Sequence, residues 1–308
     1  MSSQPRCGEG GRPLDSRTKG SLYGVIAYAM WGVFPLYFKT VATVPPLEIL
    51  AHRILWSFLV LVPLIAALRR WEDLRAIFRN RRTSLLLCGS TGLIAVNWLL
   101  FVIAVTTDRV LESSLGYFIT PLVQILLGRL ILSERLRGAQ RVSLLLAAAG
   151  VALMVGRHGT VPWISVALAA TFASYALLRK LAAAESLAGL TFETGVLFPA
   201  AFCLVAWGSL SGHGAFLTGS ARFDRLLPLA GFITAAPLLA FGGAARRVRL
   251  STLGFLQYIS PTGHFLLAVF AYGEPFGRGE LAAFLLIWAG LAIYSVDALK
   301  EYREMPRN

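Results

Sequence analysis

The sequence contains few charged residues for its length. Asp, Glu, Lys and Arg together make up 15% of the 308 residues, whereas an ordinary soluble domain has about 25%. Hydrophobic residues make up 56%. This composition excludes an ordinary cytosolic enzyme and a disordered chain, and it favours a protein that crosses a membrane several times.

Cysteine is also scarce, and the motifs of several enzyme classes are missing. The three cysteines, Cys7, Cys88 and Cys203, are odd in number and predict no disulfide framework. No spacing of Cys and His indicates a metal site, so we expect neither a metal nor another cofactor. Gly-x-Ser-x-Gly, His-Glu-x-x-His and the Walker motif are all absent. The sequence therefore predicts that the protein is not an enzyme and does not hydrolyse ATP.

Ten apolar runs follow one another along the chain. Each is close to the ~20 residues that an α-helix needs to cross ~30 Å of hydrocarbon. They lie near 20–39, 47–68, 83–106, 111–132, 140–156, 162–180, 188–208, 226–245, 250–272 and 281–299. Period-two alternation is absent, which excludes the strands of a membrane β-barrel. The predicted fold class is therefore an all-α polytopic membrane protein with ten transmembrane helices.

The net charge of +13 gains a topological meaning in such a protein. In a soluble protein it would indicate nucleic acid as a partner. Here 22 of the 29 Lys and Arg residues fall in the two tails and the even-numbered loops, and six fall in the odd-numbered loops. Because basic residues accumulate in short cytoplasmic loops, we expect both termini in the cytoplasm. Apolar residues at helical spacing in the second loop, 69–82, predict a short helix on the inner leaflet.

An internal repeat at a separation of 140 residues is the strongest pattern in the sequence. Residues 117–121, Tyr-Phe-Ile-Thr-Pro, match residues 257–261, Gln-Tyr-Ile-Ser-Pro. A glutamate follows the proline by thirteen positions in both copies, and a glycine follows sixteen residues later. These residues are Glu134 and Glu274, then Gly150 and Gly290. We expect the two glutamates to tie helix ends to loops.

The repeat divides the chain into four parts. We expect a disordered tail over 1–18, two five-helix halves over 20–156 and 162–299, and a cytoplasmic tail over 300–308. Because each half has an odd number of spans, the second half enters the membrane from the opposite side. Inverted repeats of this kind are common in secondary transporters, with the substrate site near mid-membrane between the halves.

Several stretches resemble the EamA domain of the drug/metabolite transporter superfamily and, more narrowly, RarD-type EamA transporters. They are 31–39 (WGVFPLYFK), 48–58 (EILAHRILWSF), 97–101 (NWLLF), 115–119 (LGYFI) and 250–255 (LSTLGF). The resemblance extends from about residue 20 to 299. It implies a ten-helix transporter of the cell inner membrane that exports small molecules.

Polar side chains within spans are costly in hydrocarbon and are therefore candidates for function. The predicted substrate-binding or cavity residues are His52, Arg53, Asn97, Trp98, Tyr117, Gln124, Tyr175, Gln257, Tyr258 and His264. Pro121 and Pro261 each lack a backbone N–H and predict helix kinks. These kinks act either as paired hinges or as tolerated bends that the Thr120 and Ser260 hydroxyls satisfy.

Three charged or titratable side chains have two open interpretations each. Arg53 is the only basic residue within a span, and it either pairs with Glu48 or Glu112 or binds an anionic group of the substrate. His52 is the intramembrane side chain that titrates nearest neutrality, so it either couples transport to protons or is structural. Glu193, at the position that repeats His52, either carries a coupling proton or forms a salt bridge.

Three classes of function are compatible with a polytopic membrane protein. An intramembrane enzyme would need a catalytic motif, and none is present. A non-transporting scaffold or sensor is the alternative to a transporter, but it does not explain a duplicated helix that carries proline and polar residues. We therefore expect a secondary active transporter that works by alternating access around a central cavity. Its expected partners are a small-molecule substrate and the lipid bilayer, without nucleic acid, and a homodimer stays open.

Overall fold

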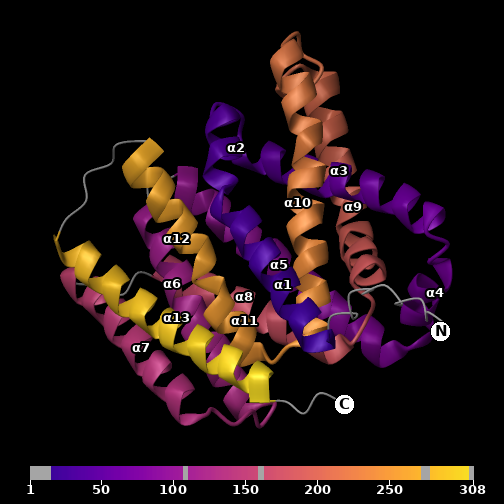
Figure 1. Ribbon diagram of the computed structural model, residues 1–308. Helices are drawn as coiled ribbons and strands as arrows, with labels where there is room; N and C mark the ends of the chain where they lie inside the picture. Colours follow the sequence, from indigo (N-terminus) through magenta and orange to yellow (C-terminus); the bar gives the residue numbers. More distant parts are fainter. Residues whose placement is uncertain (1–14, 107–109, 159–162, 272–277, 305–308) are drawn as a thin grey trace, which may run out of the picture.

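The computed structural model describes residues 15–106, 110–158, 163–271 and 278–304, and within these ranges the chain forms helices and no strand (Figure 1). The helices are α1 Ser16–Gly32, α2 Phe34–Thr40, α3 Pro46–Ala67, α4 Trp71–Arg79, α5 Arg81–Thr106, α6 Val110–Leu130, α7 Gly138–His158, α8 Trp163–Ala182, α9 Ser186–Ser211, α10 Ala221–Arg247, α11 Leu250–Gln257, α12 Ile259–Leu266, the π-helical turn η1 Leu267–Ala271 and α13 Arg278–Glu304. The predicted all-helical fold is confirmed.

Many of these helices have the length and the apolar composition that a membrane span requires. Six described segments meet this requirement, namely Ser16–Thr40, Pro46–Ala67, Arg81–Phe101, Trp163–Ala182, Ser186–Ser211 and Ala221–Arg247. Shorter apolar stretches lie at Gly116–Leu130, Gly138–Leu153 and Leu281–Asp297. In such helices the backbone N–H and C=O groups form hydrogen bonds with each other, which is necessary because hydrocarbon offers them no partner. The chain is therefore a multi-pass membrane protein.

The ends of several helices differ from the predicted runs. α1 begins at Ser16, inside the predicted tail 1–18, because the side chain of Asp15 accepts a hydrogen bond of 3.2 Å from the Arg17 N–H and caps the helix. The first run is divided at Val33, just before Pro35. At the other end, α13 continues to Glu304, beyond the predicted boundary at residue 299. The helix predicted in the second loop is present as α4.

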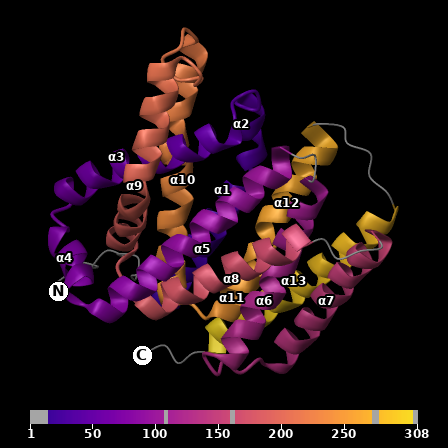
Figure 2. The same ribbon diagram turned by 180° about the vertical axis from the view of Figure 1, so that it is seen from behind.

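The helices pack mainly against partners that are distant in the sequence. α7 and α13 lie side by side along one edge of the molecule, and α9 and α10 project together from the opposite part (Figure 1). Seen from behind, α5 and α8 run together across the middle (Figure 2). α1 packs on α10 and α12, α3 packs on α9 and α10, and α6 packs on α8 and α11. The start of α1 and the end of α13 lie on the same side of the molecule.

Two glycines bring α7 and α13 into close contact. A Cβ atom added to Gly150 would lie 2.8 Å from the carbonyl oxygen of Ala283. A Cβ atom added to Gly290 would lie 2.8 Å from the carbonyl oxygen of Ser143. Small residues allow the backbones of membrane helices to approach in this way. The two glycines that end the sequence repeat therefore serve the same packing contact.

Glu134 joins the loop after α6 to the beginning of α11. Its carboxylate accepts hydrogen bonds from the backbone N–H groups of Leu250 and Ser251, at 2.8 and 3.0 Å, and from the Ser251 hydroxyl at 2.7 Å. These N–H groups have no partner within the helix, so a carboxylate stabilises them as a cap. The tie predicted for Glu134 is confirmed. Glu274 lies outside the described residues.

Replacing Gly150 or Gly290 by alanine should destabilise the protein by a similar amount, about 1–3 kcal/mol, because each methyl group would overlap a backbone carbonyl of the facing helix. Gly92→Ala is the matched control, since a Cβ at Gly92 meets no heavy atom within 4 Å. Thermal unfolding of the detergent-solubilised protein measures the effect. A control variant as unstable as the other two would contradict this account of the α7–α13 contact.

Glu134→Gln should lower stability by about 0.5–2 kcal/mol, because an amide offers one acceptor oxygen where the carboxylate offers two. Glu72→Gln on α4 is a suitable control, because the Glu72 side chain is 67% exposed and its ion pairs lie at the surface. The same unfolding measurement compares the two variants. Equal stability of both would show that the cap contributes nothing.

Candidate functional site

Arg53 of α3 is a buried cation at the meeting point of four helices. Its side chain is almost closed off, since Arg53 is 5% exposed. The Nε–H donates a hydrogen bond of 3.0 Å to the hydroxyl of Thr234 on α10. The guanidinium carbon lies 4.9 Å from the ring centre of Trp98 on α5 and 5.5 Å from that of Phe38 on α2. The charge is thus held between two aromatic rings.

Further aromatic side chains extend this arrangement. The ring of Phe101 lies 5.9 Å from Phe38 and 6.0 Å from Tyr117 on α6, and Tyr117 lies 6.4 Å from the ring of His264 on α12. His264 Nε2 is 3.0 Å from the carbonyl oxygen of Trp31. We name this set the central cluster. It comprises Phe38, Arg53, Trp98, Phe101, Tyr117, Thr234 and His264.

The surroundings of Arg53 leave most of its hydrogen-bonding capacity unused. A guanidinium has five N–H donors, and among the described residues one of them makes a hydrogen bond. Placing an arginine at the centre of a membrane helix costs about 2.5–3.5 kcal/mol or more. Each cation–π contact returns about 0.5–2 kcal/mol. The rings therefore offset part of the cost without supplying an opposite charge.

Glu48, one of the two partners predicted for Arg53, makes other contacts. Its Oε1 accepts hydrogen bonds from the backbone N–H groups of Ala215 and Phe216, at 2.6 and 3.3 Å. These residues belong to the connection between α9 and α10. The predicted Arg53–Glu48 pair is therefore wrong, because the carboxylate satisfies a loop backbone instead. The side chain of Glu112 lies outside the described residues.

His52 points away from the central cluster although it is the neighbour of Arg53. Its Nδ1 accepts a hydrogen bond of 3.0 Å from the Trp56 Nε1–H, and its Nε2 lies 3.9 Å from Glu48 Oε1. Its ring packs on that of Phe216 at 4.9 Å. Of the two predicted roles for His52, these contacts correspond to the structural one.

Glu193 of α9 belongs to a second buried polar group. Glu193 Oε1 accepts a short hydrogen bond of 2.5 Å from the Ser90 hydroxyl, and its Oε2 lies 3.6 Å from Arg179 Nη1. Both charged side chains are almost completely buried, with exposures of 2% and 3%. Tyr175 lies next to this pair. The salt bridge predicted as one role of Glu193 is present.

The other predicted cavity residues are dispersed over different contacts. Asn97 donates to the Leu168 carbonyl and the Thr171 hydroxyl, at 3.0 and 2.9 Å, and so joins α5 to α8. Gln124 donates to Gln257 Oε1 at 2.8 Å, which joins α6 to α11. These amides have partners within the chain.

Two buried tyrosines among the predicted cavity residues also lie outside the central cluster. Tyr175 stacks on Phe241 at 5.8 Å. Tyr258 packs in the apolar contact formed with α7 and α13.

The two repeated prolines have different effects on helix continuity. α6 continues through Pro121 as one helix, and the Thr120 hydroxyl bonds back to the Gly116 carbonyl at 2.8 Å. Before Pro261 the helix is divided at Tyr258 into α11 and α12. There the Thr262 hydroxyl donates to the Tyr258 carbonyl at 2.7 Å. An interruption is thus present in the second copy, and hinge motion at either proline stays a prediction.

Three members of the central cluster were missed by the sequence reasoning. Phe38 and Phe101 are ordinary apolar residues by type, and Thr234 is one of many hydroxyl residues in the runs. Phe38 and Phe101 lie in stretches that carry the family resemblance, but their residue type does not indicate contact with a buried charge. Their role follows from the packing of the helices that carry them around Arg53.

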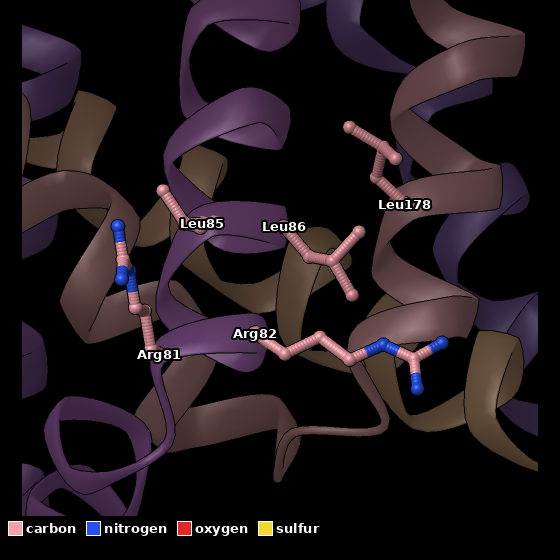
Figure 3. A pocket seen from close by; sticks show the side chains of 5 residues that line it. All are labelled: Arg81, Arg82, Leu85, Leu86 and Leu178. Carbon is pink, nitrogen blue, oxygen red and sulfur yellow. The ribbon is translucent and has the colours of Figure 1, made fainter.

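A separate surface groove of about 560 Å³ lies between α5 and α8 (Figure 3). Its lining consists of Leu85, Leu86 and Leu178 with Arg81 and Arg82 at one end. None of these residues belongs to the central cluster. The groove is apolar and open at the surface of the helix bundle, so it is separate from the buried central cluster.

Comparison with known proteins identifies the family. Residues 18–156 match the EamA-like transporter family. A protein named "Uncharacterized transporter" from Vibrio cholerae serotype O1 is 43% identical over 282 residues, covering 92% of this chain and 93% of that protein. Protein RarD of Escherichia coli (strain K12) is 43% identical over 288 residues, covering 92% of this chain and 96% of the relative.

Two more distant proteins extend the comparison. "Chloramphenicol-sensitive protein RarD" of Pseudomonas aeruginosa is 29% identical over 293 residues, with 94% and 97% of the two chains covered. A crystal structure of a protein 20% identical to this chain agrees with it at a TM-score of 0.70, covering 92% of this chain and 99% of the other. That structural likeness concerns the fold alone. Together with the closer relatives and the apolar helices, these matches show that the chain belongs to the EamA-like transporter family and is a RarD-type membrane transporter.

Proposed function

We propose that the protein is a secondary active transporter that exports a small molecule across the inner membrane by alternating access. Ten spans form two inverted halves, 20–156 and 162–299, and the substrate binds between them at the central cluster. The observation that carries the proposal is an exchange of contacts between the halves. When a residue of the first half contacts a residue of the second half, a second contact joins the residue 140 positions after the first to the residue 140 positions before the second.

The glycine contacts of α7 and α13 are the first example. Gly150 faces the Ala283 carbonyl, and Gly290 faces the Ser143 carbonyl, at the same 2.8 Å from the added Cβ atom. Adding 140 to 150 gives 290, and subtracting 140 from 283 gives 143. One contact therefore becomes the other when the halves change places. A two-fold axis between the halves has this property.

Polar side chains near the two prolines are the second example. Gln124 is hydrogen-bonded to Gln257, and His264 packs on Tyr117. The shift of 140 converts the first pair into the second, since 124 becomes 264 and 257 becomes 117. The chemistry of the two pairs differs although their places correspond. This correspondence supports an axis that passes between α6 and the segment α11–α12.

The packing of whole helices follows the same exchange. α5 on α8 corresponds to α10 on α1, and α6 on α8 corresponds to α11 and α12 on α1. The α3–α9 and α7–α13 contacts each join two corresponding helices, so exchanging the halves leaves these contacts unchanged. These relations support inversion, because they pair each helix of one half with a helix of the other.

The central cluster is suited to a substrate site because both halves contribute to it. Phe38, Arg53 and Tyr117 come from the first half, whereas Thr234 and His264 come from the second. His264 follows the interruption before Pro261. A relative motion of the halves would therefore change the surroundings of Arg53 directly.

The orientation of the protein is supported by two observations. α1 begins and α13 ends on one side of the molecule (Figure 1). The second loop, which contains α4 and has Arg69, Arg70, Arg81 and Arg82 on either side of it, lies towards this side as well. Under the positive-inside rule this side is the cytoplasmic one. A non-transporting scaffold or sensor is the alternative function, and it requires no exchange between two accessible states.

Alternating access predicts that a cysteine in the central cluster reacts from both sides of the membrane. In a variant with serine at Cys7, Cys88 and Cys203, we introduce His264→Cys and apply a membrane-impermeant maleimide to right-side-out and inside-out vesicles. Labelling is expected in both preparations. Gly92→Cys in the same background is the control, because Gly92 is exposed on the bundle surface within an apolar helix and should react in neither.

A scaffold would give labelling at His264→Cys from one side at most. It would also leave metabolite concentrations unchanged, so cells that lack or overproduce the protein are compared by untargeted metabolite measurement of cells and medium. An exporter lowers at least one small molecule in the overproducing cells and raises it in the medium.

We also propose that the Arg179–Glu193 pair is the site at which protons couple to transport. Arg179→Gln or Glu193→Gln alone should destabilise the protein by about 3–5 kcal/mol, because each leaves one buried charge without a partner. The double variant should be less destabilised than the sum of the two. Thermal unfolding in detergent measures this double-mutant cycle.

Export of the identified metabolite is then measured for the double variant and the unmodified protein under an imposed pH gradient. If both respond to the gradient equally, the Arg179–Glu193 pair is structural and does not couple transport to protons.

A further inference from the structure

We propose that the substrate is a small organic anion with an apolar or aromatic body, whose anionic group binds the guanidinium of Arg53. The inference rests on the proposed transport function and specifies the chemical class that the central cluster accepts. It is carried by the contacts of Arg53, by the way the neighbouring carboxylates are used, and by the aromatic side chains around the charge.

Arg53 has no opposite charge among the described residues. The ion pairs found there involve other cations, and the Arg53 guanidinium makes its single hydrogen bond to the neutral Thr234 hydroxyl. A buried cation without an anion is unfavourable in a low-dielectric surrounding. In a transporter the missing anion can be the substrate itself, which would bring the charge that the resting protein lacks.

The carboxylates described in the spans near Arg53 are committed elsewhere. Glu48 binds the backbone of Ala215 and Phe216. Glu193 is held by Ser90 and Arg179. Moving either to Arg53 would break the contacts that it already makes. The described part of the chain therefore offers Arg53 no carboxylate that is free to reach it.

The neighbours of Arg53 are hydrogen-bond donors or aromatic rings. The Thr234 oxygen accepts from Arg53 Nε, so the Thr234 O–H can donate to a ligand. The Tyr117 hydroxyl lies within electrostatic range of the guanidinium, whereas the Tyr37 hydroxyl donates to the Leu226 carbonyl at 3.2 Å. Hydroxyl and guanidinium donors together suit a carboxylate, which has only acceptor oxygens. A cationic ligand would meet repulsion from Arg53.

The aromatic side chains define the rest of the ligand. Phe38 and Trp98 present their rings to the charge, and Phe101 packs on Phe38. Such surfaces bind apolar or planar groups and offer few partners to a strongly polar body. Small aromatic carboxylic acids combine both properties. They differ from their amides and amines mainly in charge, which provides matched probes.

The test measures binding of benzoate, benzamide and benzylamine to the purified full-length protein in detergent, by the rise in unfolding temperature with ligand concentration. Benzoate should stabilise the protein, and the other two should bind about ten- to a hundredfold more weakly, which is the range expected for hydrogen bonds to a charged group. Equal effects of all three probes would overturn the proposal.

Variants locate the effect at Arg53. Arg53→Met should abolish the preference for benzoate, whereas Arg53→Lys, which keeps the charge without the planar fork, should retain part of it. Arg82→Met is the control, since Arg82 is an exposed arginine of α5 outside the cluster. Loss of benzoate binding in Arg82→Met to the same extent as in Arg53→Met would also contradict the assignment.

Two outcomes separate this inference from the proposed function. If His264→Cys is labelled from both sides but benzoate is not preferred, the protein is a transporter of another substrate class. If Arg53→Met is unstable and Glu112→Gln restores its stability, Glu112 is the counter-charge of Arg53, and the anion site is refuted while transport is not.

Discussion

Hydrocarbon provides no hydrogen-bond partner for a polar group, and this constraint governs both the backbone and the side chains of the protein. The backbone responds by forming helices over nearly all described segments. Hydroxyl side chains bond back to the preceding turn, as Thr91 does to Leu87 and Thr194 does to Leu190. Larger polar groups find partners on neighbouring helices, as in the Gln124–Gln257 pair. Against this background, the sparse contacts of Arg53 are exceptional.

The proposed two-fold relation explains why the protein can be regular in its packing and asymmetric in its chemistry. The glycine contacts of α7 and α13 recur because both halves must bring backbones equally close. Elsewhere the same places carry different side chains. Gln124 corresponds to His264 and Tyr117 to Gln257, so one end of the axis holds an amide pair and the other an aromatic and imidazole pair. Only the second of these pairs joins the central cluster.

The buried charged side chains also differ between the two halves. Arg179 and Glu193 neutralise each other within the second half. In the first half, His52, which corresponds to Glu193, is held by Trp56, and its neighbour Arg53 contacts aromatic rings. The charges of this pair compensate each other as long as Glu193 is ionised, and a proton on Glu193 would leave Arg179 without its partner. A lone cation is sensitive to what enters its surroundings, which is the property that a ligand site needs.

The sequence by itself determined the helical membrane fold, since run length and hydropathy follow from the thickness of the bilayer. It also indicated the family and the tie at Glu134, and it left a salt bridge as one of two roles for Glu193, because unusual residue types mark those places. It did not determine which polar residues meet. His52 and Arg53 are adjacent in the chain, yet they point to different neighbours because successive residues of a helix lie about 100° apart. Thr234, Phe38 and Phe101 became recognisable only when tertiary packing brought four helices around Arg53. Local patterns record how each helix meets lipid, whereas the partners of a buried side chain depend on the packing of helices far apart in the sequence.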